Sequence, residues 1–188
     1  MLSALRLLIA TACRCVLPNA ASIILAEAAQ PVTLGFVYAH PAHGIAFAGG
    51  IGLAPFAPGT FGTLLAFPLW MLLAAVGGAV MQILVFIIFF GVGSWACQVT
   101  GRALGVSDHG GMVWDETVAF LLVLIFTPPG WAWQIAAFVL FRFFDIVKPQ
   151  PIRYFDRTLK NGFGVMFDDL LAAGYTLIVL ALAKTFIG

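Results

Sequence analysis

Charged side chains are concentrated in one stretch of this chain, between residues 142 and 169. Only 9% of the 188 residues are charged, yet this stretch holds five of the nine Lys and Arg residues and four of the eight acids. Carboxylates are hard oxygen ligands that suit Mg²⁺, and interspersed Arg and Lys side chains suit a phosphate group. The combination therefore predicts a metal-assisted phosphoryl site.

A second group of ionisable side chains lies earlier, at Asp108, His109, Asp115 and Glu116. The last two begin an apolar segment, and an acid at the start of a helix is stabilised by the helix dipole. Capping accounts for one acid, whereas two adjacent acids close to Asp108 and His109 exceed what a cap needs. For each acid taken alone, helix capping and a role in a functional site remain alternative explanations.

The charged stretch also has a local pattern. Arg142 and Asp145 are three residues apart, so they share a helical face and can pair. Asp145 follows an unbroken apolar helix and is expected to be the deepest acid. The KPQP segment at residues 148–151 predicts the end of that helix, and Asp168 and Asp169 are predicted to open and cap the next one. Pairing and capping explain each feature alone, but not their coincidence on one face.

A glycine-rich segment at residues 49–70 leads into the first good apolar run. Glycines let backbone N–H groups approach an anion closely, and a helix that begins after them directs its positive end at a phosphate. The segment lacks the Gly-Lys-Ser/Thr of a nucleotide-binding loop. On spacing alone, phosphate binding and a tight turn with Thr60 or Thr63 as helix N-cap stay equally open.

Composition predicts an integral membrane protein, because 62% of the residues are hydrophobic, against about 45–50% in soluble proteins. A net charge of +1 argues against nucleic-acid binding, which needs a dense basic surface. The expected partners are lipid, metal and small anions, and nothing indicates an obligate protein partner. Three cysteines support neither a disulfide framework nor a four-cysteine zinc site.

The predicted fold is all-α, a multi-spanning helical bundle with about four to five membrane helices, some of them short. These helices are expected at residues 63–79, 81–99, 113–127, 131–147 and 170–187. The third would be only about 22 Å long, less than the ~30 Å hydrocarbon core, so its acidic end must lie near or below the headgroups.

Three polar loops are predicted to share one face of the bundle, because each helix reverses the direction of the chain. They lie at residues 49–62, 101–116 and 142–169. The last two contain six basic residues, whereas the turns at residues 77–80 and 128–130 contain no Lys or Arg. This bias predicts a cytoplasmic face. Ionisable groups at membrane depth are costly, so they favour a functional interpretation.

The first 44 residues are assigned separately from a membrane domain at residues 45–188. Residues 1–30 are apolar with two arginines, and a signal peptide, an interfacial helix and an extra span are all open. The segment that follows has no sustained period and is predicted to be a connection. His40 and His43 are expected to be solvated loop residues within it.

Four motifs occur in a fixed order between the apolar segments. They are APGTFGT (57–63), DHGGMVWDE (108–116), RFFDIVKPQPIRYFD (142–156) and GFGVMFDD (162–169). Together they resemble the bacterial phosphatidylglycerophosphatase A family over roughly residues 49–175. The resemblance implies a Mg²⁺-dependent hydrolase of the bacterial inner membrane that converts phosphatidylglycerophosphate to phosphatidylglycerol and phosphate. Composition and spacing alone reach only a cytoplasm-facing metal and phosphate site.

The motifs and the resemblance together assign the site residues. The Mg²⁺ ligands are expected to be Asp115, Glu116, Asp145, Asp168 and Asp169, with Asp115, Glu116 and Asp169 also taking part in catalysis. The phosphate is expected to contact Arg142, Lys148, Arg153, Thr60, Gly59 and Gly62. Asp108 or His109 is the expected proton carrier.

Two other classes of protein remain as alternatives. An ion-coupled transporter also places acids within a membrane, but its acids should line a path, and the sequence has no inverted repeat. A structural membrane anchor would leave the charge cluster unexplained.

Overall fold

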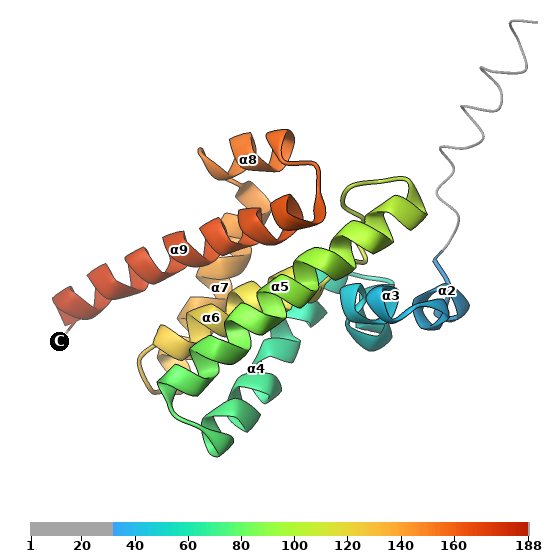
Figure 1. Cartoon of the computed structure of the whole chain (residues 1–188). Coiled ribbons are helices and arrows are strands. Elements are labelled where there is room, and N and C mark those ends of the chain that lie inside the picture. Colours follow the sequence, from blue (N-terminus) through green and yellow to red (C-terminus); the bar gives the residue numbers. More distant parts are fainter. Residues whose placement is uncertain (1–31, 188) are drawn as a thin grey trace, which may run out of the picture. The chain divides into compact units, whose positions relative to one another are not determined.

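Every regular element is helical in residues 32–187, the part of the chain that the computed structural model describes (Figure 1). The elements are α2 (Leu34–Ala39), α3 (Pro41–Ala46), η1 (Ala48–Leu53), α4 (Pro58–Val76), α5 (Ala79–Leu104), α6 (Trp114–Phe126), α7 (Trp131–Val147), α8 (Ile152–Thr158) and α9 (Gly162–Ile187). The predicted all-α class is confirmed.

Among the described residues, three helices, α4, α5 and α9, are long and apolar enough to cross a membrane. Helices α6 and α7 have 13 and 17 residues, so they extend only about 20 and 26 Å. Eight of the 13 residues of α6 are buried, because the helix packs against α4, α5, α7 and α9. Helix α6, the predicted short third helix, therefore lies at the centre of a helical membrane bundle, where the other helices surround it.

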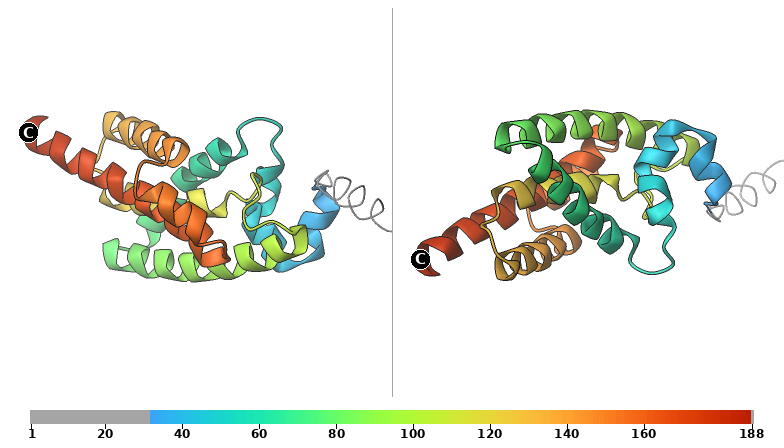
Figure 2. Two further views of the ribbon diagram at one scale, coloured as in Figure 1. Left: turned by 90° about the horizontal axis from the view of Figure 1, so that it is seen from above. Right: turned by 90° about the horizontal axis from the view of Figure 1, so that it is seen from below.

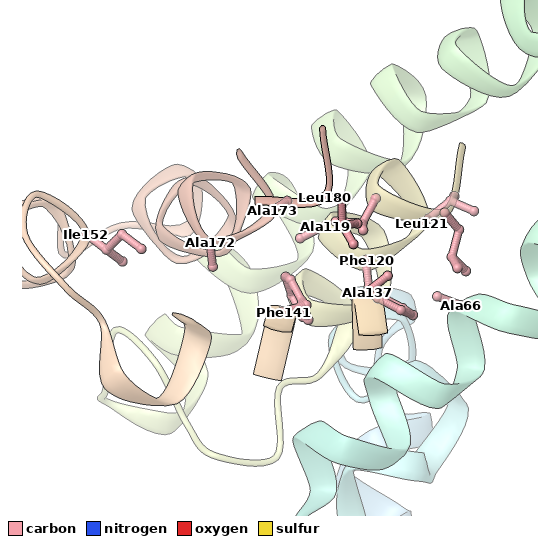
Figure 3. Packing of buried hydrophobic residues seen from close by; sticks show 12 residues of the cluster. Ala66, Ala119, Phe120, Leu121, Ala137, Phe141, Ile152, Ala172, Ala173 and Leu180 are labelled. Carbon is pink, nitrogen blue, oxygen red and sulfur yellow. The ribbon is translucent and has the colours of Figure 1, made fainter. Parts of the chain in front are cut away.

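Small and aromatic side chains let the helices pack closely around α6. Ala66 of α4, Ala137 of α7 and Ala172 of α9 are fully buried in the same cluster (Figure 3). The ring of Phe120 lies 5.3 Å from that of Phe141 and 5.4 Å from that of Phe67, centroid to centroid. Close van der Waals packing of this kind holds helices together where lipid offers no hydrophobic driving force.

The chain reverses direction at each turn of the bundle, as predicted. The α4–α5 turn, the α6–α7 turn and the C-terminal end of α9 lie at one end of the bundle (Figure 1). Helices α2, α3 and η1 lie at the other end, beside the C-terminal half of α5 (Figure 2). The starts of α4, α6 and α9 and the end of α7 therefore share that second end.

The prediction that Asp168 and Asp169 open a helix is wrong, because α9 begins six residues earlier at Gly162. Glycine there permits close contact with α5, since a Cβ on Gly162 would lie 2.1 Å from the carbonyl oxygen of Ser94. The Asn161 side chain caps the new start by accepting a hydrogen bond from the Gly164 N–H at 2.7 Å. The two acids thus lie in the second turn of α9, where capping no longer explains them.

The segment before α4 is also more ordered than predicted, because it folds into α2, α3 and η1. Pro41 begins α3, and the His40 side chain accepts a hydrogen bond from the Ala42 N–H as its N-cap. His43 was expected in solvent but is buried, with its Nδ1 2.9 Å from the Thr100 hydroxyl. The predictions for residues 1–30 lie outside the described residues, and the division after residue 44 stays a prediction.

Candidate active site

Four aspartates from three helices are buried at the end of the bundle that carries the large loops. Asp168 and Asp169 of α9 are each 4% exposed, Asp115 of α6 is 5% exposed and Asp145 of α7 is 8% exposed. The carboxylate of Asp169 interacts electrostatically with those of Asp145, Asp115, Asp168 and Glu116. These four aspartates and Glu116, the five predicted ligands, thus lie at the same end of the bundle. Asp145 is not the deepest of them, because it lies in the last turn of α7.

Arg142 joins three helices at one side of this acid cluster. Its Nη1 donates hydrogen bonds to Glu116 Oε1 at 3.1 Å and to the Thr63 hydroxyl at 3.3 Å, and it forms an ion pair with Asp145 Oδ2 at 2.7 Å. The predicted pair between Arg142 and Asp145 is confirmed. The same guanidinium also holds α6 and α4, so its role is wider than a pair within one helix.

Two polar atoms beside Arg142 are buried without a hydrogen-bond partner among the described residues. They are Oε2 of Glu116 and Nε of Arg142 itself. An unpartnered buried polar atom costs about 1–3 kcal/mol, and more when it is charged. The free carboxylate oxygen suits a cation and the free N–H suits an anion, so both atoms fit a site that binds a metal and a phosphate.

Lys148 lies at the other side of the cluster, directly after α7. The helix ends there as predicted, with Lys148 in the left-handed conformation at the C-cap. Its ammonium group donates to Asp168 Oδ2 and, at 3.1 Å, to Asp156 Oδ1. Burial by itself lowers the pKa of Lys148, but the neighbouring carboxylates outweigh it and raise the pKa above its usual value. Lys148 is therefore a cation throughout the neutral pH range.

The glycines of the first motif bring α4 close to the acids. A Cβ on Gly59 would lie 1.9 Å from Glu116 Oε1, and a Cβ on Gly62 would lie 2.7 Å from the carbonyl oxygen of Val113. The Thr117 hydroxyl donates to the Gly62 carbonyl at 2.8 Å and locks this approach. The glycines therefore keep space beside the Glu116 carboxylate.

Neither Thr60 nor Thr63 is the N-cap of α4, so that alternative is wrong. The cap position is Ala57, followed by Pro58 in the first turn. The hydroxyl of Thr63 instead donates to the Gly59 carbonyl at 2.9 Å while it accepts from Arg142. Thr60 lies one residue from Gly59 and is partly exposed.

Arg153 and His109 lie at the edge of the site. Arg153, on α8, is exposed and donates to the carbonyl of Val147 at 3.1 Å, so it caps the end of α7. The His109 ring accepts from the Gly111 N–H at 3.1 Å and packs beside Phe47. These contacts stabilise the loop between α5 and α6. Asp108 is exposed in the same loop and lines a narrow cleft with Asp156 and Asp168.

Two residues with contacts in the site were given no role by the sequence. Thr63 was considered only as a cap, and Asp156 was counted only among the acids of the charged stretch. The signal for Asp156 was its place in the third motif, eight residues after Lys148. The turn at residues 148–151 brings Asp156 back to Lys148. The signal for Thr63 was its place one turn after Gly59.

No three acid, histidine or cysteine side chains in residues 32–187 already converge as a ready-made metal site. The described ion pairs account for this, because Arg142 and Lys148 hold oxygens of Glu116, Asp145 and Asp168. The donor set of carboxylates fits Mg²⁺ by chemistry and burial.

A Gly59→Ala change tests the space beside Glu116. We expect the catalytic activity of the cluster to fall by about 100-fold, because the added methyl group must displace one of its carboxylates. Gly91→Ala on α5 is the matched control, since a Cβ there meets nothing within 4 Å and activity should not change. Equal activity of the two variants would contradict a role for this approach.

These features define an all-helical membrane protein with a cluster of buried carboxylates and two cations at one end of its bundle. The sequence model of the family described as phosphatidylglycerophosphatase A matches residues 44–184. The chain belongs to this family, as the four motifs indicated. The transporter alternative finds no support in these comparisons.

Individual relatives agree with the family match. The chain is 47% identical over 142 residues to a phosphatidylglycerophosphatase A of Haemophilus influenzae, covering 75% of this chain and 87% of the relative. It is 40% identical over 134 residues to a phosphatidylglycerophosphatase A of Escherichia coli, covering 71% and 77%. It is also 40% identical over 148 residues to a putative phosphatidylinositol-3-phosphatase of Bacteroides thetaiotaomicron, covering 74% and 91%. No solved structure matches the chain.

Proposed function

We propose that this protein is a Mg²⁺-dependent phosphatase of the bacterial inner membrane. Its substrate is phosphatidylglycerophosphate, and its products are phosphatidylglycerol and phosphate. Family membership and the names of two relatives support the reaction and the substrate. The active site faces the cytoplasm and lies between α4, α6, α7 and α9.

The charge balance of the buried cluster carries the metal part of this proposal. Five carboxylates face two cations, Arg142 and Lys148, and Lys148 is shared with Asp156, so at least three negative charges lack a partner when all the acids are ionised. Uncompensated buried charge is costly. One or two divalent cations would offset this charge. Oε2 of Glu116 has no hydrogen-bond partner among the described residues, so it could coordinate such a cation. Asp115, Glu116, Asp145, Asp168 and Asp169 would hold the metal.

Hydrolysis of a phosphomonoester needs an attacking water and a protonated leaving group. When bound, Mg²⁺ would polarise the phosphoryl group and activate the water. Among Asp115, Glu116 and Asp169, one carboxylate accepts the proton of the water while a new P–O bond forms. The bond between phosphorus and the glycerol oxygen then breaks, and that oxygen takes up the proton that the carboxylate accepted, which returns the carboxylate to its ionised form.

Arg142 and Lys148 bind the phosphate from opposite sides of the cluster. The free Nε–H of Arg142 donates to a non-bridging oxygen, while its Nη1 keeps the guanidinium in place. Lys148 stays charged near neutral pH, and Asp156 and Asp168 fix its position. Arg153 lies closer to the surface, where it meets the lipid headgroup, and the Gly59 to Gly62 turn borders the phosphate.

The orientation of the protein follows from its charges. We expect reporter fusions after Gly62, Gly110 and Lys160 to report the cytoplasm, because the loops at that end carry most of the described Lys and Arg residues. Fusions at Gly78 and Gly130, at the other end of the bundle, should report the periplasm. A periplasmic signal at Gly110 would contradict the proposed orientation.

A panel of lipid phosphates tests the proposed substrate. The purified protein should release phosphate from phosphatidylglycerophosphate faster than from phosphatidic acid or phosphatidylinositol 3-phosphate. The last lipid belongs in the panel because one relative bears the name of a phosphatase for it. Preferential release from another member of the panel would replace the proposed substrate.

A further inference from the structure

A groove of about 480 Å³ runs between α4 and α7 on the side of the bundle that would face lipid. Leu64, Phe67 and Met71 of α4 form one wall, at the spacing of one helical face. Trp131 and Ile135 of α7 form the other wall. The lining is apolar except for Gln134 of α7, and the volume of the groove lies within the range of ligand pockets.

The groove begins at Leu64, one residue from the Thr63 that contacts Arg142, and ends at Gly130, at the far end of α7. On α7, the face that carries Trp131 and Ile135 continues through Phe138 to Arg142, which is seven residues from Ile135. The Phe67 and Phe138 rings lie 6.3 Å apart and close the groove toward the core. The hydrogen bond from Arg142 to the Thr63 hydroxyl joins α7 to α4 next to Leu64, at the end of the groove nearer the acids.

The length of the groove matches one leaflet of a bilayer. From Arg142 back to Gly130, at the far end of the groove, α7 extends about 18 Å, and half of the hydrocarbon core measures about 15 Å. Water does not fill an apolar groove at this depth, and exposed side chains such as Leu64, Met71 and Ile135 offer apolar contact along its length.

We infer that this groove binds one acyl chain of the lipid substrate while the phosphate of that lipid contacts Arg142. This inference rests on the proposed function. The acyl chain adds binding energy in proportion to its length, and the groove directs the headgroup to the end where Glu116 and Arg142 have free polar atoms.

Substrates of two chain lengths test the groove. Leu64→Trp and Ile135→Trp each fill it from one wall, so KM for dioleoyl phosphatidylglycerophosphate should rise about tenfold, the worth of roughly two buried methylene groups. Activity on water-soluble dibutyryl phosphatidylglycerophosphate should stay within about twofold of the unchanged protein, because its short chains do not reach the groove.

A second groove supplies the matched control. It has about 450 Å³, is lined by Phe126, Leu177 and Ala181 of α6 and α9, and lies at the end of the bundle away from the acid cluster. Ala181→Trp should change the activity on neither substrate. The inference fails if Leu64→Trp and Ile135→Trp change the activity on the long-chain and the short-chain substrate equally, or change neither activity.

Photocrosslinking separates this inference from the proposed function, because it does not require turnover. Phosphatidylglycerophosphate with a diazirine in its acyl chain should label α4 near Leu64 and α7 near Ile135, and unlabelled phosphatidylglycerophosphate should compete. Labelling elsewhere, or equal competition by phosphatidylcholine, would overturn the groove assignment even if the protein is active. A lack of phosphate release with specific labelling would instead refute the proposed function alone.

Discussion

Asp169→Asn is expected to lower kcat/KM for phosphatidylglycerophosphate by about 100-fold or more, and raised Mg²⁺ should restore part of the loss. Asp169 is 4% exposed and interacts with the other four carboxylates, so the change removes one charge from the centre of the cluster. The amide has nearly the same shape as the acid, so the fold should persist. Phosphate release, measured across a Mg²⁺ titration, gives the result.

Lys148→Ala is the comparison variant for this titration. It removes a cation that is proposed to bind the phosphate, so KM should rise at least about tenfold with little dependence on Mg²⁺. Because Asp168 loses its partner in this variant, monodispersity in detergent must first show that the protein is folded. Identical Mg²⁺ titrations for the two variants would contradict the roles assigned to Asp169 and Lys148.

Asp145 has the second large expected effect, because it is both the partner of Arg142 and a proposed ligand. A pairing role tolerates Asp145→Glu, since a longer acid can still reach the flexible Arg142 side chain. A ligand role does not tolerate it, because the carboxylate would move by about one methylene group. We therefore expect Asp145→Glu to remain folded and to lose about 100-fold in activity.

Double variants of the same pair sharpen this test. Arg142→Asp/Asp145→Arg restores opposite charges, and Arg142→Met/Asp145→Leu removes both, which is often neutral for stability in a buried pair. The structure predicts a stability cost in either case, because Arg142 also pairs with Glu116. Neither variant can place a carboxylate where Asp145 was, so both should be inactive. Substantial activity in either would remove Asp145 from the site.

The sequence predicted the helices of the bundle well where a long apolar run ends at strong turn signals. The α4–α5 turn at Gly77 and Gly78, the α6–α7 turn, and the end of α7 before Lys148 all lie where expected. Hydrophobicity and proline act locally, so they can be read without tertiary contacts.

The start of α9 could not be predicted in this way, because Gly162 and Gly164 usually indicate a loop. Here they permit contact with α5 and with Leu159, and only packing between distant segments reveals that use. The burial of His43 against Thr100 has the same cause, since the two residues are 57 positions apart.

The acid cluster was predicted from residue types, but the links among its members were not. Sequence spacing gave the Arg142–Asp145 pair because both residues lie on one helix. The contacts of Arg142 with Glu116 and Thr63, and of Lys148 with Asp156 and Asp168, join separate elements. They depend on the way the bundle closes, which local patterns do not encode.

Phosphate release from phosphatidylglycerophosphate, measured before and after chelation of divalent cations, tests the central claim most directly. We expect the purified protein to release phosphate in the presence of Mg²⁺, EDTA to abolish the release and added Mg²⁺ to restore it, because the five carboxylates are proposed to hold the cation that activates the substrate. Undiminished release in EDTA, or no release under any condition, would contradict it.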